Sequence, residues 1–217
     1  TGIHSIALAR KGFNVVGIDR SKRMNFVAKE KSKSLPDAVR NRVRFVQSEY
    51  KNLEEVLPER FDAIMFMGAI LAHNPNPEQL LKEFNKVLTK KAIAICQVAN
   101  YEKVIKIKKR FYDFNIRKAH LSGEKEQAFL RFFDELEDGF LTQNVAVFAR
   151  GEKRWGFRGM HSVSIYPLDK KKLEKLFREI KFSHFSIYGG EEGYYYDYLF
   201  RKPFKPDSDV LVLVARR

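Results

Sequence analysis

The sequence predicts an α/β fold: a doubly wound, mostly parallel sheet with an antiparallel strand pair near its C-terminal end and an antiparallel β insert. Three observations lead to this prediction. Helical and apolar strand segments alternate through residues 3–98, as they do in parallel α/β sheets. Gly2 precedes the first helix and Asp19 follows the first strand, near the glycine-to-acid spacing of nucleotide-binding α/β units. Over residues 116–166 the pattern changes to the alternation of antiparallel strands.

The composition is that of a globular protein with no disulfide framework. The chain has 217 residues, of which 44% are hydrophobic, and this is enough for a substantial core. Its one cysteine, Cys96, excludes an internal disulfide and a multi-thiolate zinc site, and we expect no metal. No apolar run approaches the length of a membrane span, and no signal peptide is evident. We therefore expect a cytoplasmic protein that has no membrane partner.

The net charge of +14 raises the possibility of a nucleic-acid partner. The basic residues are spread along the chain, however, and a solvated lysine-rich surface explains this distribution more simply. Nucleic acid therefore stays an alternative partner.

The first nineteen residues combine a glycine, a helix, a strand and an acid. The periodicity predicts a helix over residues 3–11 and a short apolar strand from Phe13 to Ile18. Gly2 permits close approach of a ligand to the backbone, and the start of the helix offers N–H groups to an anion. Asp19, at the carboxyl end of the strand, is placed to accept hydrogen bonds from both hydroxyls of a ribose.

This region resembles the class I, Rossmann-like S-adenosylmethionine-dependent methyltransferases. Thr1-Gly2 is similar to the end of the family's glycine motif, and residues 19–24 are similar to its Asp-x-Ser-x-x-Met stretch. The resemblance implies S-adenosylmethionine as cofactor. The family's first strand, its acid and its earlier glycines would precede Thr1, so that strands 13–18 and 61–68 would flank a gap in the sheet if Thr1 were a true terminus. The cofactor-binding residues that it implies here are Thr1, Gly2, Asp19, Arg20 and Met24.

The next two predicted strands add residues to the same expected cleft. The strand 43–47 leads into Glu49, which corresponds to a family acid that commonly hydrogen-bonds the adenine amino group, and we place Glu49 and Tyr50 at the cofactor. The strand 61–68 corresponds to the family's fourth, whose end lines the methyl-transfer site. We therefore expect Met67 and Gly68 in the cleft.

The middle of the chain is predicted to contain a helix after Asn74, a buried strand over 92–98 and a basic amphipathic helix over 101–115. Cys96 lies in the middle of the strand and is interpreted as inert core. Domain boundaries follow from the change of period: a cofactor-binding domain over 1–115 and 167–217, and an antiparallel lid or substrate insert over 116–166.

The C-terminal part is predicted to contain a helix over 168–178 and two strands, 180–188 and 209–215. In the resembled family this strand pair is antiparallel and lies at one edge of the sheet. Between the two strands lies an aromatic loop that contains Tyr194–Tyr198. Such a loop either lines a substrate pocket or packs against itself, and stacking of nucleic-acid bases is a third interpretation.

The leading functional hypothesis is methyl transfer from S-adenosylmethionine to a nitrogen or oxygen atom of a small-molecule acceptor. The alternatives are an RNA methyltransferase acting on tRNA or rRNA, an NAD-dependent oxidoreductase, for which Asp19 is equally suitable, and a non-catalytic methyltransferase-like binding protein. His73, His161 and Tyr166 are possible bases, but a structural role is favoured for each and no catalytic residue is assigned. The sequence does not indicate an oligomeric state.

Overall fold

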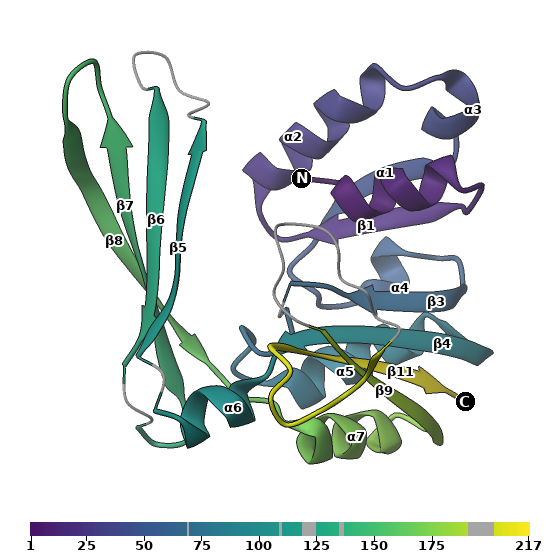
Figure 1. The fold of residues 1–217 in the computed structure, drawn as a ribbon. Helices are drawn as coiled ribbons and strands as arrows, with labels where there is room; N and C mark the ends of the chain where they lie inside the picture. Colours follow the sequence, from purple (N-terminus) through teal and green to yellow (C-terminus); the bar gives the residue numbers. More distant parts are fainter. Residues whose placement is uncertain (69, 109, 119–124, 135–136, 191–201) are drawn as a thin grey trace. The chain divides into compact units, whose positions relative to one another are not determined.

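The computed structural model describes residues 1–68, 70–108, 110–118, 125–134, 137–190 and 202–217 (Figure 1). They divide into two compact units. The first contains Thr1–Arg60 and Glu83–Val87, and the second contains Phe61–Lys82 and Leu88–Arg217. The predicted α/β class is confirmed. Among the described residues, every helix is too short or too polar to span a membrane.

The first unit is built on two parallel strands, β1 (Val15–Asp19) and β2 (Val43–Gln47). Asp19 is paired with Gln47, so the carboxyl ends of both strands coincide. The Ser21 hydroxyl caps α2 by accepting the Met24 N–H (3.2 Å), as expected for a serine at this position. The helices of this unit are α1 (Ile3–Arg10), α2 (Lys22–Lys33), α3 (Asp37–Arg40) and α4 (Leu53–Val56), with the last turn of α5 (Pro77–Lys86).

A buried carboxylate lies in the part of α5 that belongs to the first unit. Glu83 is nearly inaccessible to solvent, and its Oε1 accepts a hydrogen bond from Lys86 Nζ (2.6 Å). This hydrogen bond is the main reason why the pKa of Glu83 is held below its usual value. A carboxyl whose pKa falls on folding stabilises the folded state above its unfolded pKa, and that stability is lost as the pH drops through the folded value.

Glu83→Gln is therefore expected to lower the free energy of unfolding at neutral pH by about 1–2 kcal/mol, because it removes a charged hydrogen bond from a buried position. The difference from the wild type should shrink in acid, where the wild-type carboxyl is itself protonated. Urea unfolding at neutral and acidic pH measures both effects.

Glu30→Gln is the matched control for this experiment. Glu30 pairs with Lys33 at the same helical spacing and the same 2.6 Å separation, but both side chains are exposed. Its loss should change the free energy of unfolding by less than about 0.5 kcal/mol. Equal effects of the two substitutions would show that burial of Glu83 contributes nothing.

The second unit contains a five-stranded sheet in the order β10-β9-β11-β4-β3. β3 (Phe61–Phe66) is parallel to β4 (Leu88–Ala99), whereas β11 (Val210–Arg216) is antiparallel to both β4 and β9 (His184–Gly190). The predicted antiparallel C-terminal pair is thereby confirmed, and a two-residue strand, β10 (Lys202–Pro203), extends the sheet beyond β9.

The core of the second unit includes a cluster of three phenylalanines around helix α7 (Lys170–Glu179). Phe177 on α7 is fully buried, and its ring packs edge-on against Phe182 (centroids 5.8 Å apart) and Phe66 (6.3 Å). Phe66 is the last residue of β3 and directly precedes Met67 and Gly68. The cluster thus packs against the end of β3.

The second unit also contains an antiparallel sheet in the order β5-β6-β7-β8. Its strands are β5 (Phe111–Lys118), β6 (Glu126–Phe133), β7 (Leu141–Arg150) and β8 (Trp155–Ile165). The last three lie within residues 116–166 and confirm that this range forms antiparallel strands. The predicted helix over 101–115 is wrong beyond its first part, since α6 ends at Lys106 and residues from Phe111 onward pair with β6.

The reason for this error is that the local sequence permits both structures. Lys108 has a positive φ (49°), which ends the helix, and β6 then supplies hydrogen-bond partners that no local pattern reveals. The antiparallel sheet consequently starts at Phe111, earlier than the predicted insert boundary at 116.

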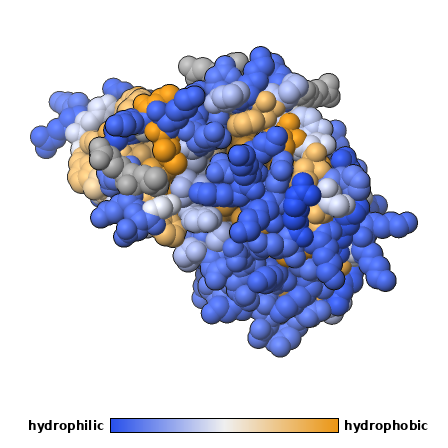
Figure 2. All heavy atoms as spheres, turned by 90° about the horizontal axis from the view of Figure 1, so that it is seen from below, coloured by the Kyte–Doolittle hydropathy of each residue, from blue (hydrophilic) through white to orange (hydrophobic). Residues whose placement is uncertain are grey.

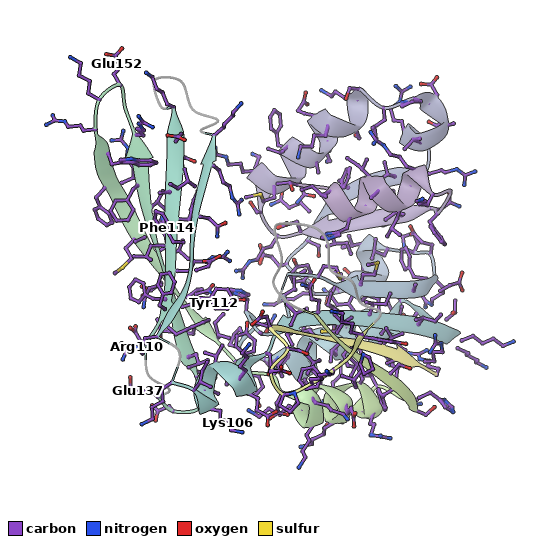
Figure 3. All side chains as sticks on the ribbon, viewed as in Figure 1. Lys106, Arg110, Tyr112, Phe114, Glu137 and Glu152 are labelled. Carbon is purple, nitrogen blue, oxygen red and sulfur yellow. The ribbon has the colours of Figure 1, made fainter. Side chains whose placement is uncertain are left out.

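A bulge in β5 determines which side chains share a face. The register with β6 shifts between Phe111 and Asp113, so Tyr112 is an extra residue. Tyr112 lies beneath the Arg131 guanidinium, and Asp113 pairs directly with Arg131. Tyr112 and Asp113 therefore share one face of the sheet, and Phe114 belongs to the other (Figure 3).

Candidate functional site

A small cavity of about 70 Å³ lies at the carboxyl end of β1 in the first unit. Four of the residues that the sequence predicted at the cofactor line this cavity. They come from three separate parts of the unit: the chain start, β1 and α2. The residues that line it include Thr1, Gly2, Ser5, Asp19, Met24 and Asn25.

Asp19 is held in a fixed position at this cavity. Its Oδ1 accepts the Ser21 N–H (2.9 Å), and Asn25 Nδ2 donates to the Asp19 carbonyl (2.8 Å) and to the Ser21 carbonyl (3.0 Å). A carboxylate can accept about four hydrogen bonds, so the bond to Ser21 leaves capacity for two ribose hydroxyls. The turn therefore orients the acid and keeps it able to bind a nucleoside.

The two glycines beside the cavity allow one aromatic ring to pack closely. A Cβ at Gly2 would lie 2.8 Å from the Phe45 ring, and one at Gly17 would lie 2.7 Å from it. Gly2 also has a φ of 74°, which other residues adopt only with strain. Gly2 is followed directly by the first turn of α1, whose N–H groups favour an anionic ligand group.

Tyr50 follows β2 and lies close enough to Asp19 for the carboxylate charge to act on its hydroxyl. Burial is the main reason why the pKa of Tyr50 is raised, and the charge of Asp19 raises it further. The ring packs against Phe84 (5.8 Å between centroids). Glu49 and Arg20 also contribute to the electrostatic environment of the Tyr50 hydroxyl, so the predicted residues of both strand ends gather in one region.

These residues fit the nucleoside part of S-adenosylmethionine. The oriented Asp19 carboxylate suits the ribose, and Glu49 and Tyr50 follow the adjacent strand end. The helix start at Gly2 suits the amino-acid carboxylate of the cofactor.

A larger cavity of about 160 Å³ lies within the second unit. Gly68, predicted at the methyl-transfer site, lines it, whereas Met67 does not belong to its lining. Most of its polar lining was missed from the sequence. The polar residues that line it are His73, Gln97, Tyr101, Tyr112, Arg131 and Gln143.

Arg131 is the cationic side chain of this cavity, and its orientation is fixed. Its Nε donates to Asp113 Oδ1 (2.6 Å), and its NH2 group donates to Asp113 Oδ2. The guanidinium carbon lies 5.5 Å from the centroid of the Tyr112 ring, and Tyr112 packs edge-on against Phe133 (5.4 Å). A two-point ion pair and an aromatic platform thus hold the guanidinium at the cavity.

Burial raises the pKa of two further side chains near the cavity. Tyr101, which lines it, is therefore a neutral phenol that can donate a hydrogen bond at neutral pH. The pKa of Cys96 is also raised by burial, and the predicted inert core thiol is confirmed as a buried cysteine.

The structure separates the three candidate bases. His73 lines the cavity of the second unit. His161 is exposed on β8, opposite Val145, and is not part of that lining. Tyr166 also lies outside the lining, since its ring packs near Phe140 (5.7 Å).

Within the described ranges, His, Cys, Asp and Glu form no cluster able to hold a metal ion. The predicted aromatic loop at Tyr194–Tyr198 lies outside the described residues.

Two features missed from the sequence had local signals. Gln97 is a nearly buried amide within the apolar run of β4, and Arg131 is a cation within the apolar run of β6. A polar residue in such a strand requires a partner or a ligand. Gln143 gave no comparable signal because β7 alternates in character, and Tyr112 gave none because its segment was predicted to be helical.

Residues 1–91 match the family described as methyltransferase domain. The glycine/sarcosine N-methyltransferase of Aphanothece halophytica is 26% identical to the chain over 224 residues, which cover 100% of the chain and 73% of the relative. The enzyme of the same name from Halorhodospira halochloris is 24% identical over 220 residues, which cover 100% of the chain and 72% of the relative.

Solved structures show the same fold at lower identity. The CcbJ methyltransferase from Streptomyces caelestis has a TM-score of 0.68 and 17% identity, with 98% of this chain and 83% of that chain covered. An S-adenosylmethionine-dependent methyltransferase from Clostridium acetobutylicum has a TM-score of 0.64 and 14% identity, with 94% and 74% covered. The matched domain and these relatives support methyl transfer over the NAD-dependent alternative. Residues 1–91 therefore carry a methyltransferase domain, and the chain is an S-adenosylmethionine-dependent methyltransferase whose fold is that of the class I, Rossmann-like enzymes.

Proposed function

We propose that the chain methylates the amino nitrogen of a small amino acid, glycine or sarcosine, bound in the cavity of the second unit. The observation that carries this proposal is the Arg131 guanidinium, which is fixed by Asp113 at the lining of a cavity of about 160 Å³. An oriented guanidinium binds a carboxylate with two parallel hydrogen bonds. The names of the two relatives, glycine/sarcosine N-methyltransferase, support the same acceptor class.

The chemistry requires little of the protein beyond positioning. When bound, S-adenosylmethionine supplies an electrophilic methyl group. In this proposal Arg131 holds the acceptor carboxylate, and Tyr101 and Gln97 add hydrogen bonds around the acceptor. The methyl group would pass from the bound cofactor to the acceptor nitrogen, so alignment of the acceptor and exclusion of water are the main contributions of the chain.

A proton must also leave the acceptor. The ammonium form of an amino acid has no lone pair, so it loses one proton before the nitrogen can attack. His73 is the histidine that lines the cavity, and we assign it the role of accepting this proton.

The test measures transfer of a labelled methyl group from S-adenosylmethionine to glycine, sarcosine, glycolate and bulk tRNA. Glycolate retains the carboxylate of glycine but replaces its amine with a hydroxyl. We expect labelled sarcosine and dimethylglycine as products, and no transfer to glycolate or tRNA. Arg131→Met should raise the KM for glycine by about ten- to a hundredfold, because a charged hydrogen bond contributes about 1.5–3 kcal/mol.

Arg150→Met is the matched control variant. Arg150 on β7 pairs with Glu126 on the neighbouring β6 (2.7 Å), as Arg131 pairs with Asp113, but it does not line the cavity. It should leave the KM unchanged. Labelled tRNA, labelled glycolate or an unchanged KM for Arg131→Met would each contradict the proposal.

A further inference from the structure

We infer that one face of the antiparallel sheet β5–β8 is the interface of a symmetric dimer, formed against the same face of a second copy of this chain. The register divides the sheet into two faces, because residues paired across antiparallel strands point to the same side. The face that includes Asp113 and Arg131 borders the cavity of the second unit. The opposite face of the sheet is here called the outer face.

The outer face consists of two adjacent rows of apolar side chains that cross the four strands. The first row is Phe114, Leu130, Ala146 and Met160, and the second is Ile116, Ala128, Phe148 and Phe157. Neither row contains a polar residue. An antiparallel sheet that faces water on one side normally alternates apolar and polar residues, so this face is unlike a solvated one.

Much of this surface is exposed in the single chain. The exposed fraction is 60% for Phe157, 54% for Phe114, 53% for Met160 and 52% for Ile116, and Trp155 at the end of β8 is 40% exposed. An aromatic side chain offers about 150–250 Å² of surface, so these five residues leave on the order of 500 Å² of apolar area accessible. Contiguous apolar areas of that size indicate interaction sites.

The arrangement of large and small side chains on the outer face suits packing against the same face of a second copy. At its centre the small side chains Ala128 and Ala146 lie on one diagonal, and the large side chains Leu130 and Phe148 lie on the other. Two such faces related by a twofold axis can place large residues over small ones, as interdigitating sheets do. The amount of surface is also appropriate: the five exposed side chains and their rim approach the roughly 800 Å² per partner of a standard interface.

The rim of the outer face favours a second copy over a membrane or an acidic partner. At one end lie Lys118 and the ion pair between Glu126 and Arg150 (2.7 Å), so both signs of charge are present. At the other end Phe111 and Phe132 lie in the same cross-strand row as Asn144 and Ser162, which hydrogen-bond each other (2.6 Å), so this end is partly apolar. An apolar surface with charges of both signs at its border is typical of a protein interface, whereas an anionic surface would require a border of basic residues alone.

The test is sedimentation equilibrium of the whole chain over a wide range of concentrations. The wild type is expected to show a reversible equilibrium between one chain and two. Phe157→Glu should raise the dimer dissociation constant at least about thirtyfold, because it places a charge in the second apolar row of the interface. Phe26→Glu is the matched control: Phe26 is 63% exposed on α2 in the first unit, and its change should leave the constant unaltered. Circular dichroism confirms that both variants fold.

Three outcomes would overturn the inference. The first is a wild type that sediments as one chain at every concentration. The second is a dimer that dissociates in Phe26→Glu but persists in Phe157→Glu. The third is an open-ended series of larger species, which would indicate head-to-tail contacts instead of a closed twofold interface.

Discussion

Asp19→Ala is expected to raise the dissociation constant for S-adenosylmethionine by at least about a hundredfold. The Asp19 carboxylate is oriented by Ser21 and lines the cavity at the end of β1, where we expect it to accept both ribose hydroxyls. Hydrogen bonds to a charged group contribute about 1.5–3 kcal/mol each, and two of them therefore account for a hundredfold or more. Isothermal calorimetry with the cofactor measures this change directly.

Two further variants separate cofactor binding from local folding. Asp19→Asn keeps an oxygen that can accept the Ser21 N–H, so it should preserve the turn and still weaken binding through loss of charge. Asp37→Ala removes an exposed acid from α3, where it pairs with Arg40, and should bind the cofactor as the wild type does. Wild-type affinity in Asp19→Ala would show that this acid does not contact the cofactor.

Phe177→Ala is expected to lower the free energy of unfolding of the second unit by about 3–5 kcal/mol. The Phe177 ring is fully buried between Phe66 and Phe182, so its removal leaves a cavity beneath the end of β3. A loss of this size corresponds to a fall in melting temperature of roughly 10 °C. The chain contains one tryptophan, Trp155, which lies in β8 of the same unit, and its fluorescence provides the readout.

Phe13→Ala is the control for this prediction. Phe13 is largely exposed, and its truncation should change the free energy of unfolding by no more than about 0.5 kcal/mol. Because Phe66 directly precedes Met67 and Gly68, Phe177→Ala should also weaken methyl transfer. Equal melting temperatures of Phe177→Ala and the wild type would contradict the assigned core.

The sequence predicted those parts of the molecule that depend on local pattern. Gly2, Asp19 and Met24 are close in sequence, and one helix and one strand suffice to bring them to the same cavity. The alternation over residues 116–166 was enough to predict an antiparallel insert. In each case short-range periodicity carries the information.

Features that depend on partners distant in the sequence could not be predicted from local patterns. Phe111–Lys118 satisfies both a helical and a strand pattern, and only its pairing with β6 decides between them. The larger cavity joins Gln97, Arg131 and Gln143 from three separate strands, which no spacing rule connects. The burial of Glu83 likewise follows from packing around α5, since its position in the sequence is that of an ordinary charged helix residue.

The single extra residue at Tyr112 has a consequence for how this enzyme can change. It places a phenol and a carboxylate on the side of β5 that faces the cavity, and leaves Phe114 and Ile116 on the other. The residues that would select an acceptor and those that would join two chains therefore alternate along one strand without sharing a surface. Substitutions that broaden acceptor range can accumulate on one side while assembly is conserved on the other, whereas a one-residue slip in the pairing of β5 with β6 would exchange the two roles at once.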